Sequence, residues 1–108
     1  MLQFNQKNID KSLDGMGERV VVLFYANWCP FCRRFKSVFE SWAGKSGVKF
    51  AMAEVAEDDN PMWDSFGVEV IPTIVAFRGH KELARRNGKA GIGLSEDDLK
   101  SLLEQISA

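Results

Sequence analysis

Strongly apolar runs alternate along this chain with segments whose apolar residues recur at helical spacing. Residues 19–26 form a continuous β-prone run without alternation, which is typical of a strand buried on both faces of a sheet. Residues 48–55 and 73–77 are predicted as further strands. Gly79-His80 then joins the last of these to residues 81–86, which predicts an antiparallel hairpin.

Four helices are predicted around these strands. In the clearest of them, apolar residues lie at positions i, i+3, i+4 and i+7, namely Phe35, Val38, Phe39 and Trp42. Glycines that follow the helical patterns mark their ends. The predicted helices are residues 9–16, a helix from Pro30 to Gly44, a short one from Asn60-Pro61 to Gly67, and one after Ser95 that buries Leu99, Leu102, Leu103 and Ile106.

This order of elements predicts an α/β fold. Strands separated by helices pair in parallel through crossovers, and the terminal hairpin adds antiparallel strands to the same sheet. We therefore expect a central mixed sheet flanked by helices on both faces. At 108 residues, residues 1–108 are expected to form a single domain. Residues 87–93, before the last helix, are predicted as a flexible stretch.

Composition and charge narrow the function classes. The chain is 45% hydrophobic and 27% charged, with a formal net charge of −1, so no overall field favours nucleic acid or an anionic membrane. The longest strongly apolar run, residues 20–26, is shorter than the roughly 20 residues of a membrane helix. Residues 1–7 lack the apolar core of a secretory signal. These observations predict a cytoplasmic protein that binds neither nucleic acid nor membrane. We also expect a monomer, which these observations do not test.

Both cysteines lie in residues 28–32, Trp-Cys-Pro-Phe-Cys, where a strand gives way to a helix. Cys29 is expected at the helix cap, since Pro30 suits the first helical position, and Cys32 one turn deeper. Helix N-termini and Cys-x-x-Cys sites lower the pKa of a cysteine from about 8.5 to about 3.5–7.5, so we expect Cys29 to be an exposed, ionised nucleophile. Cys32 would then resolve the mixed disulfide that Cys29 forms with a substrate.

The cysteines have two alternative roles. The pair could be two small buried hydrophobic residues, or half of a zinc site. A structural zinc takes four ligands, and beyond the two cysteines the chain offers only His80, predicted in a hairpin turn. An iron–sulfur cluster shared between two chains stays open as an alternative. We predict no metal and no dissociable cofactor.

Several sequence motifs carry a family resemblance across nearly the whole chain. They are Phe24-Tyr25-Ala26-Asn27-Trp28-Cys29-Pro30-Phe31-Cys32, Asn60-Pro61, Phe66-Gly67-Val68, Ile71-Pro72-Thr73 and Phe77-Arg78-Gly79. With them the chain resembles the thioredoxin family. The resemblance implies a thioredoxin fold and a cis Ile71–Pro72 bond that faces the cysteines. It also implies that substrate segments pair with the backbone of Ile71, within an apolar rim of Trp28, Pro30, Phe31, Ile71 and Pro72.

The chain departs from the family pattern at three places. Pro30-Phe31 stands where thioredoxins have Gly-Pro, and is similar to the Pro-Tyr of glutaredoxins. Leu23 stands where thioredoxins bury a carboxylate that relays protons to the second thiol, and Glu54 aligns with a buried lysine of many members. We hypothesise that Glu54 accepts the Cys32 proton, directly or through water, with its pKa raised by burial. A solvated strand-end carboxylate is the alternative.

The resemblance implies a thiol-disulfide oxidoreductase that reduces or exchanges protein disulfides. Its expected partners are protein disulfide substrates and an electron donor, either a reductase or glutathione. A glutathione-dependent, glutaredoxin-like enzyme is one alternative. A partner-binding module that is switched by the state of its disulfide is another.

Overall fold

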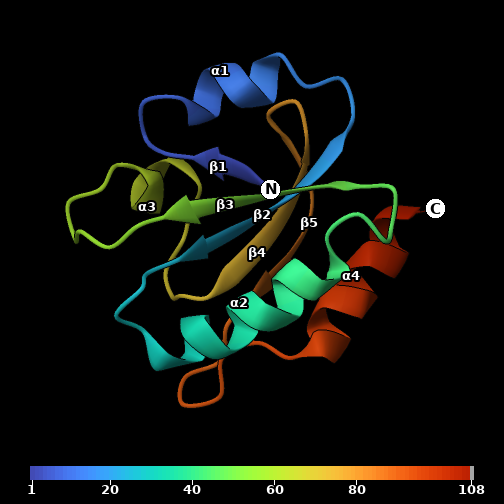
Figure 1. The fold of residues 1–108 in the computed structure, drawn as a ribbon. Coiled ribbons are helices and arrows are strands. Elements are labelled where there is room, and N and C mark those ends of the chain that lie inside the picture. The colour runs from blue at the N-terminus through green and yellow to red at the C-terminus, as the bar shows by residue number, and fades with distance from the viewer. Residues whose placement is uncertain (108) are drawn as a thin grey trace.

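The computed structural model describes residues 1–107, in which five strands form one mixed sheet of order β1-β3-β2-β4-β5. Helices cover both faces of this sheet (Figure 1). The strands are β1 (Leu2–Phe4), β2 (Arg19–Tyr25), β3 (Lys49–Glu54), β4 (Thr73–Arg78) and β5 (Lys81–Asn87). The helices are α1 (Ile9–Asp14), α2 (Pro30–Trp42), α3 (Met62–Ser65) and α4 (Glu96–Ser107). The predicted α/β class and mixed sheet are therefore confirmed.

Strand β1 is the element that the apolar pattern did not predict. It has three residues, of which Leu2 and Gln3 are exposed, so it carries no extended apolar run. It pairs in parallel with β3 at the edge of the sheet, with Leu2 opposite Ala51 and Phe4 opposite Ala53. The chain thus begins with a strand, where the sequence pattern predicted a helix as the first element.

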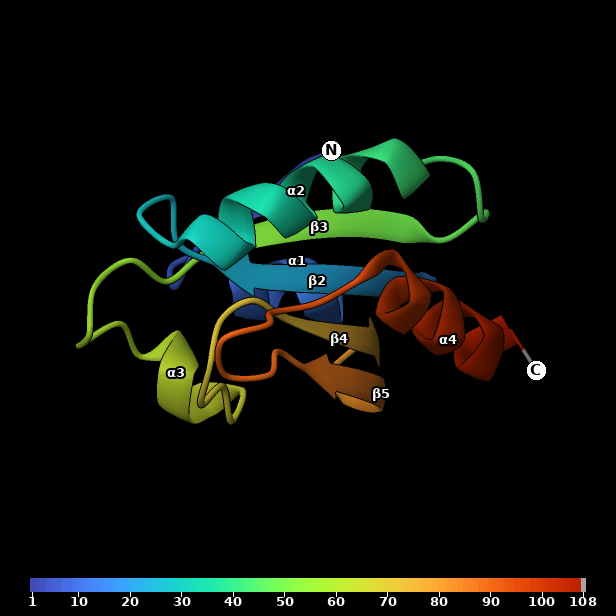
Figure 2. The ribbon, with the colours of Figure 1, turned by 90° about the horizontal axis from the view of Figure 1, so that it is seen from below.

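The sheet separates two hydrophobic cores. Residues 20–24 of β2 are inaccessible on both faces, which is why their sequence shows no alternation. One core joins Leu23 and its face of the sheet to Phe35 and Phe39 of α2 and to the apolar stripe of α4. The other core joins Phe24 and the opposite face to α1 and α3. Figure 2 shows α2 and α4 on one side of this layered arrangement. Within residues 1–107, no helix has both the length and the apolar character needed to cross a membrane.

The sheet topology determines where the cysteines lie. Strand β2 runs antiparallel to β4, with Phe24 opposite Thr73. The end of β2 therefore lies beside the beginning of β4. Because the cysteines follow β2 and Pro72 precedes β4, the two segments meet at one end of the sheet.

His80 lies in the turn between β4 and β5, as predicted, and connects this hairpin to α1. Its Nε2 is 3.0 Å from Asp10 and its Nδ1 is 2.6 Å from Asp14. The hydrogen bond with Asp10, and after it the one with Asp14, raises the pKa of His80 above its ordinary 6.5. A raised histidine pKa means that the folded state binds the proton more tightly than the unfolded state does.

Replacing His80 by glutamine should therefore destabilise the protein only when the histidine of the wild type is charged. The decrease in the free energy of unfolding should have its full size below pH 6.5, and it should vanish as the pH rises through the raised pKa of His80. Because the groups are exposed, we expect a loss of about 1 kcal/mol or less. Urea unfolding near about pH 5.5 and about pH 9 measures it. An equal loss of stability at both pH values would contradict the pairing of charged His80 with Asp10 and Asp14. A D10N/D14N variant should lose stability with the same pH dependence as His80→Gln.

Candidate active site

Cys29 is the N-cap of α2, and Pro30 occupies the first helical position. Cys29 is extended, with φ −89° and ψ 117°, so its side chain turns back over the first turn of the helix. There its Sγ accepts a hydrogen bond from the backbone N–H of Cys32, 3.4 Å away. The predicted placement of both residues at the helix start is confirmed. The Cys29 sulfur thus lies at the N-terminal end of α2, where the backbone N–H groups of the first turn carry partial positive charge.

Both cysteines are free thiols in this structure, and both are buried. Cys29 is 5% exposed and Cys32 1% exposed. The prediction that Cys29 is exposed is therefore wrong, because neighbouring segments close over its sulfur, although it remains the more accessible of the two. Burial, and then the hydrogen bond with Cys29, raises the pKa of Cys32 to about 12. Cys32 is accordingly a protonated thiol at neutral pH.

Ile71 covers the sulfur from the other side of the site. The Ile71–Pro72 peptide bond is cis, as the family resemblance implies. The carbonyl oxygen of Ile71 lies 3.9 Å from Cys29 Sγ and accepts from the thiol. Thr73, which is fully buried, donates its hydroxyl to the carbonyl of Val70 at 2.8 Å and so anchors the end of this segment.

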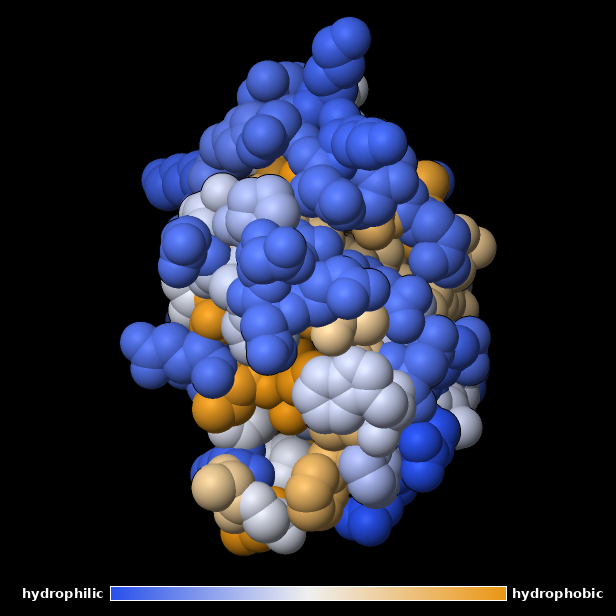
Figure 3. Space-filling view, turned by 90° about the vertical axis from the view of Figure 1, so that its left-hand side faces the viewer, coloured by the Kyte–Doolittle hydropathy of each residue, from blue (hydrophilic) through white to orange (hydrophobic). Residues whose placement is uncertain are grey.

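An apolar surface surrounds the buried sulfur. Trp28 is 60% exposed, and its indole N–H donates to the carbonyl of Ala56 at 3.2 Å, which orients the ring. Pro30 is exposed, and Phe31 and Ile71 are half-buried. Figure 3 views this end of the molecule, where hydrophobic residues gather in the lower half of the face beneath a hydrophilic upper half.

Val70 and Ile92 are exposed apolar residues that sequence reasoning did not select. Val70 directly precedes the Ile71-Pro72-Thr73 motif, and this position could have indicated from the sequence that Val70 belongs to the site. Ile92 lies in residues 87–93, which were predicted as a flexible stretch. In the structure this stretch forms a turn closed by two hydrogen bonds between Lys89 and Gly93, at 3.0 and 2.8 Å.

Two glycines hold this turn against the active site. A Cβ on Gly88 would collide with the carbonyl oxygen of Pro72, and a Cβ on Gly93 would lie 2.9 Å from the Cβ of Phe31. Both glycines therefore allow close approach of the chain. The turn is therefore packed against Phe31, which lies between the two cysteines, and against the cis proline Pro72.

The position of the family's buried carboxylate is apolar in this chain. Leu23 is fully buried, in the same hydrophobic core as Cys32. Glu54 ends β3 opposite Tyr25 in the parallel ladder, but its side chain is exposed. The predicted burial of Glu54 is therefore wrong, because β3 ends there and its last side chain reaches solvent. Burial, and then the charge of Glu54, raises the pKa of Tyr25. The role of Glu54 as acceptor of the Cys32 proton stays a prediction.

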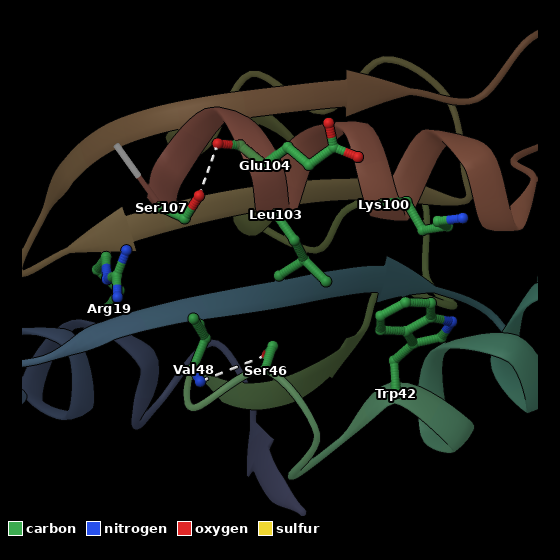
Figure 4. Close-up of a pocket in the computed structure, with 8 residues that line it drawn as sticks. All are labelled: Arg19, Trp42, Ser46, Val48, Lys100, Leu103, Glu104 and Ser107. Atoms are coloured by element: carbon green, nitrogen blue, oxygen red, sulfur yellow. Dashed lines mark hydrogen bonds between the residues drawn. The ribbon is translucent and has the colours of Figure 1, made fainter.

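A cavity of about 240 Å³ lies away from the cysteines, between α4, the start of β2 and the segment after α2. Figure 4 shows Trp42, Val48 and Leu103 as its apolar walls, with Arg19 and Lys100 at its sides. None of the predicted site residues lines it. The candidate active site is thus a surface around a buried sulfur, separate from this cavity.

Comparison with known proteins adds independent information about the chain. The family model described as Thioredoxin matches residues 1–105. A thioredoxin of Mycoplasmoides gallisepticum is 31% identical over 101 residues, which are 93% of this chain and 95% of that protein.

Solved structures agree with the fold. The X-ray structure of Fasciola hepatica thioredoxin superposes with a TM-score of 0.80 at 27% identity, covering 97% of this chain and 98% of that one. A thioredoxin f2, solved in a complex with ferredoxin:thioredoxin reductase, superposes with a TM-score of 0.86 at 16% identity. That match covers 99% of this chain and 94% of the other.

Proposed function

This chain belongs to the thioredoxin family and is a thiol-disulfide oxidoreductase of that type, and on this basis we propose that Cys29 attacks protein disulfides and Cys32 completes the reaction. The observation that carries the assignment is the position of Cys29. Its sulfur caps α2 and lies 3.9 Å from the Ile71 carbonyl. The attacking species is the Cys29 thiolate, because a cysteine acts as a nucleophile in its thiolate form.

The reaction has two exchange steps. In the first, the Cys29 thiolate attacks one sulfur of the substrate disulfide, that S–S bond breaks, and one substrate thiolate leaves. In the second, Cys32 loses its proton and attacks the Cys29 sulfur, which releases the second substrate thiolate and forms the Cys29–Cys32 disulfide. The substrate gains two electrons, the two cysteines lose two, and their protons end on the substrate thiols.

The substrate is proposed to be an extended protein segment. Because the Cys29 sulfur is only 5% exposed, a substrate must approach along the apolar surface that surrounds it. Trp28, Pro30 and Phe31 provide this surface on one side and Ile71 on the other. Pro72, which was expected in the rim, is buried and adds no surface. A segment that pairs with the backbone of Ile71 would place its disulfide next to Cys29.

The reduced state has to be restored by an electron donor. A thioredoxin f2 is known in complex with ferredoxin:thioredoxin reductase, which supports a reductase as the partner of this chain as well. Glutathione is the alternative donor. We place the protein in the cytoplasm, where thiols are kept reduced.

Catalysed reduction of insulin by dithiothreitol tests the proposed function. We expect the protein to accelerate insulin precipitation over dithiothreitol alone, at concentrations far below that of insulin. Acceleration only with glutathione as the reductant would favour the glutaredoxin-like alternative. Binding of insulin without turnover under either reductant would contradict an enzymatic role and favour a redox-switched binding module.

A further inference from the structure

Arg85, on strand β5, makes contacts that reach the segment leading to the active site. Its side chain is 21% exposed, so most of its length is inside the protein. Its Nη1 donates to the carbonyl of Gly67 at 2.8 Å, and its Nη2 donates to the carbonyl of Phe66 at 2.5 Å. The Nη2 also lies 3.1 Å from Glu82.

These two carbonyls come directly after α3, which ends at Ser65. Phe66 is the C-cap of α3 and Gly67 is the residue after it, so neither carbonyl has a partner within the helix, and the guanidinium bonds groups that would otherwise depend on water. Residues 67–72 then run without helix or strand until β4 begins at Thr73. Val68 is buried in the second core and its N–H donates to the carbonyl of Trp63 at 2.8 Å, and side-chain hydrogen bonds hold the segment at its two ends.

The Arg85 guanidinium is the anchor at the start of this segment, and the Thr73 hydroxyl is the anchor at its end. Between them lies Ile71, whose carbonyl is 3.9 Å from the Cys29 sulfur. We propose that Arg85 is a positioning residue for substrate, because its two bonds to the Phe66 and Gly67 carbonyls place the backbone of Ile71 beside Cys29. This inference rests on the proposed function, in which substrate segments pair with Ile71.

The planar guanidinium is required for this role. It presents two nitrogens in a rigid fork and can hold two neighbouring carbonyls at once, which a lysine ammonium does not match in geometry. Within residues 1–107 the buried Arg85 Nε has no hydrogen-bond partner, so the hydrogen bonds of the side chain there are those of its two outer nitrogens.

The experiment compares Arg85→Met with Arg86→Met, its neighbour on β5. Arg86 donates instead to Ser101 of α4 and to the Arg85 carbonyl, and makes no contact with the Phe66 or Gly67 carbonyls. We expect Arg85→Met to raise KM for a protein disulfide about fivefold or more, because substrate pairing is disturbed. Its reaction with the small disulfide 5,5′-dithiobis(2-nitrobenzoate), which needs only the sulfur, should stay within about twofold of wild type. Arg86→Met should leave both reactions unchanged.

Two further variants separate positioning from folding. Arg85→Lys keeps the charge but not the fork, so it should raise KM by an intermediate factor, and it serves as the test if Arg85→Met does not fold. Glu82→Gln removes the ion pair and leaves the carbonyl bonds, so it should behave as wild type. Equal KM values for Arg85→Met and Arg86→Met, or a parallel loss of both reactions in folded Arg85→Met, would overturn the inference. An inactive wild type would overturn the proposed function itself.

Discussion

Replacing Cys32 by serine should stop the reaction after one step and leave the substrate covalently bound to Cys29. Cys29 can still attack, but serine cannot displace the substrate from the mixed disulfide. Turnover of insulin should fall by a factor on the order of 1,000 or more. Mass spectrometry of the protein after mixing with a disulfide substrate should show one adduct per chain.

The Cys29→Ser variant is the matched control for this trap. It should lose turnover to a similar extent, but it should form no adduct, because Cys32 is 1% exposed and its pKa of about 12 leaves it protonated. An adduct on Cys32 in that variant would show that the order of attack proposed above is reversed.

The second exchange step should accelerate steeply with pH. Only the thiolate of Cys32 attacks, and burial, the largest cause, raises its pKa to about 12. In the mixed disulfide the Cys29 sulfur no longer bonds to the Cys32 thiol, but burial persists. We expect the rate to rise about tenfold per pH unit, or about 100-fold between about pH 7 and about pH 9. Stopped-flow release of 5-thio-2-nitrobenzoate from the Cys29 adduct measures this step.

A Glu54→Gln variant separates two routes for the Cys32 proton. Ionisation into water gives the steep profile, whereas transfer to Glu54 would give a rate nearly independent of pH above the ordinary carboxylate range. Because the Glu54 side chain is exposed, we expect the steep profile in both wild type and variant. A flat wild-type profile that becomes steep in Glu54→Gln would instead assign the proton to Glu54.

The sequence predicted the elements whose signal is local. Continuous apolar runs marked β2, β3 and β4 to within one or two residues, and Pro30 marked the start of α2. The N-cap position of Cys29 could be predicted as well. Pro30 suits the first helical position, and a disulfide between Cys29 and Cys32 needs a shorter Cβ–Cβ distance than two residues within a regular helix provide.

The features that were missed depend on contacts between distant residues. Arg85 donates to backbone carbonyls eighteen and nineteen residues earlier in the chain. Because every residue has a backbone carbonyl, the sequence does not show which ones accept such hydrogen bonds. The burial of Cys29 depends on where Ile71 lies. Strand β1 is too short to show a pattern, and the burial predicted for Glu54 failed because a strand end can point into solvent.

The contact between Gly93 and Phe31 links two positions that would otherwise evolve separately. A side chain at position 93 would place its Cβ 2.9 Å from the Cβ of Phe31, which every residue except glycine has, and it would need the φ of +79° that favours glycine. A smaller residue at position 31 alone would leave a gap beside Gly93. Position 93 is therefore restricted to glycine while position 31 carries a side chain, and a change at position 31 has to be accommodated by the rest of the loop. Exchange of the Pro30-Phe31 dipeptide for that of another oxidoreductase would transfer its redox behaviour faithfully only together with a matching change in the loop before α4.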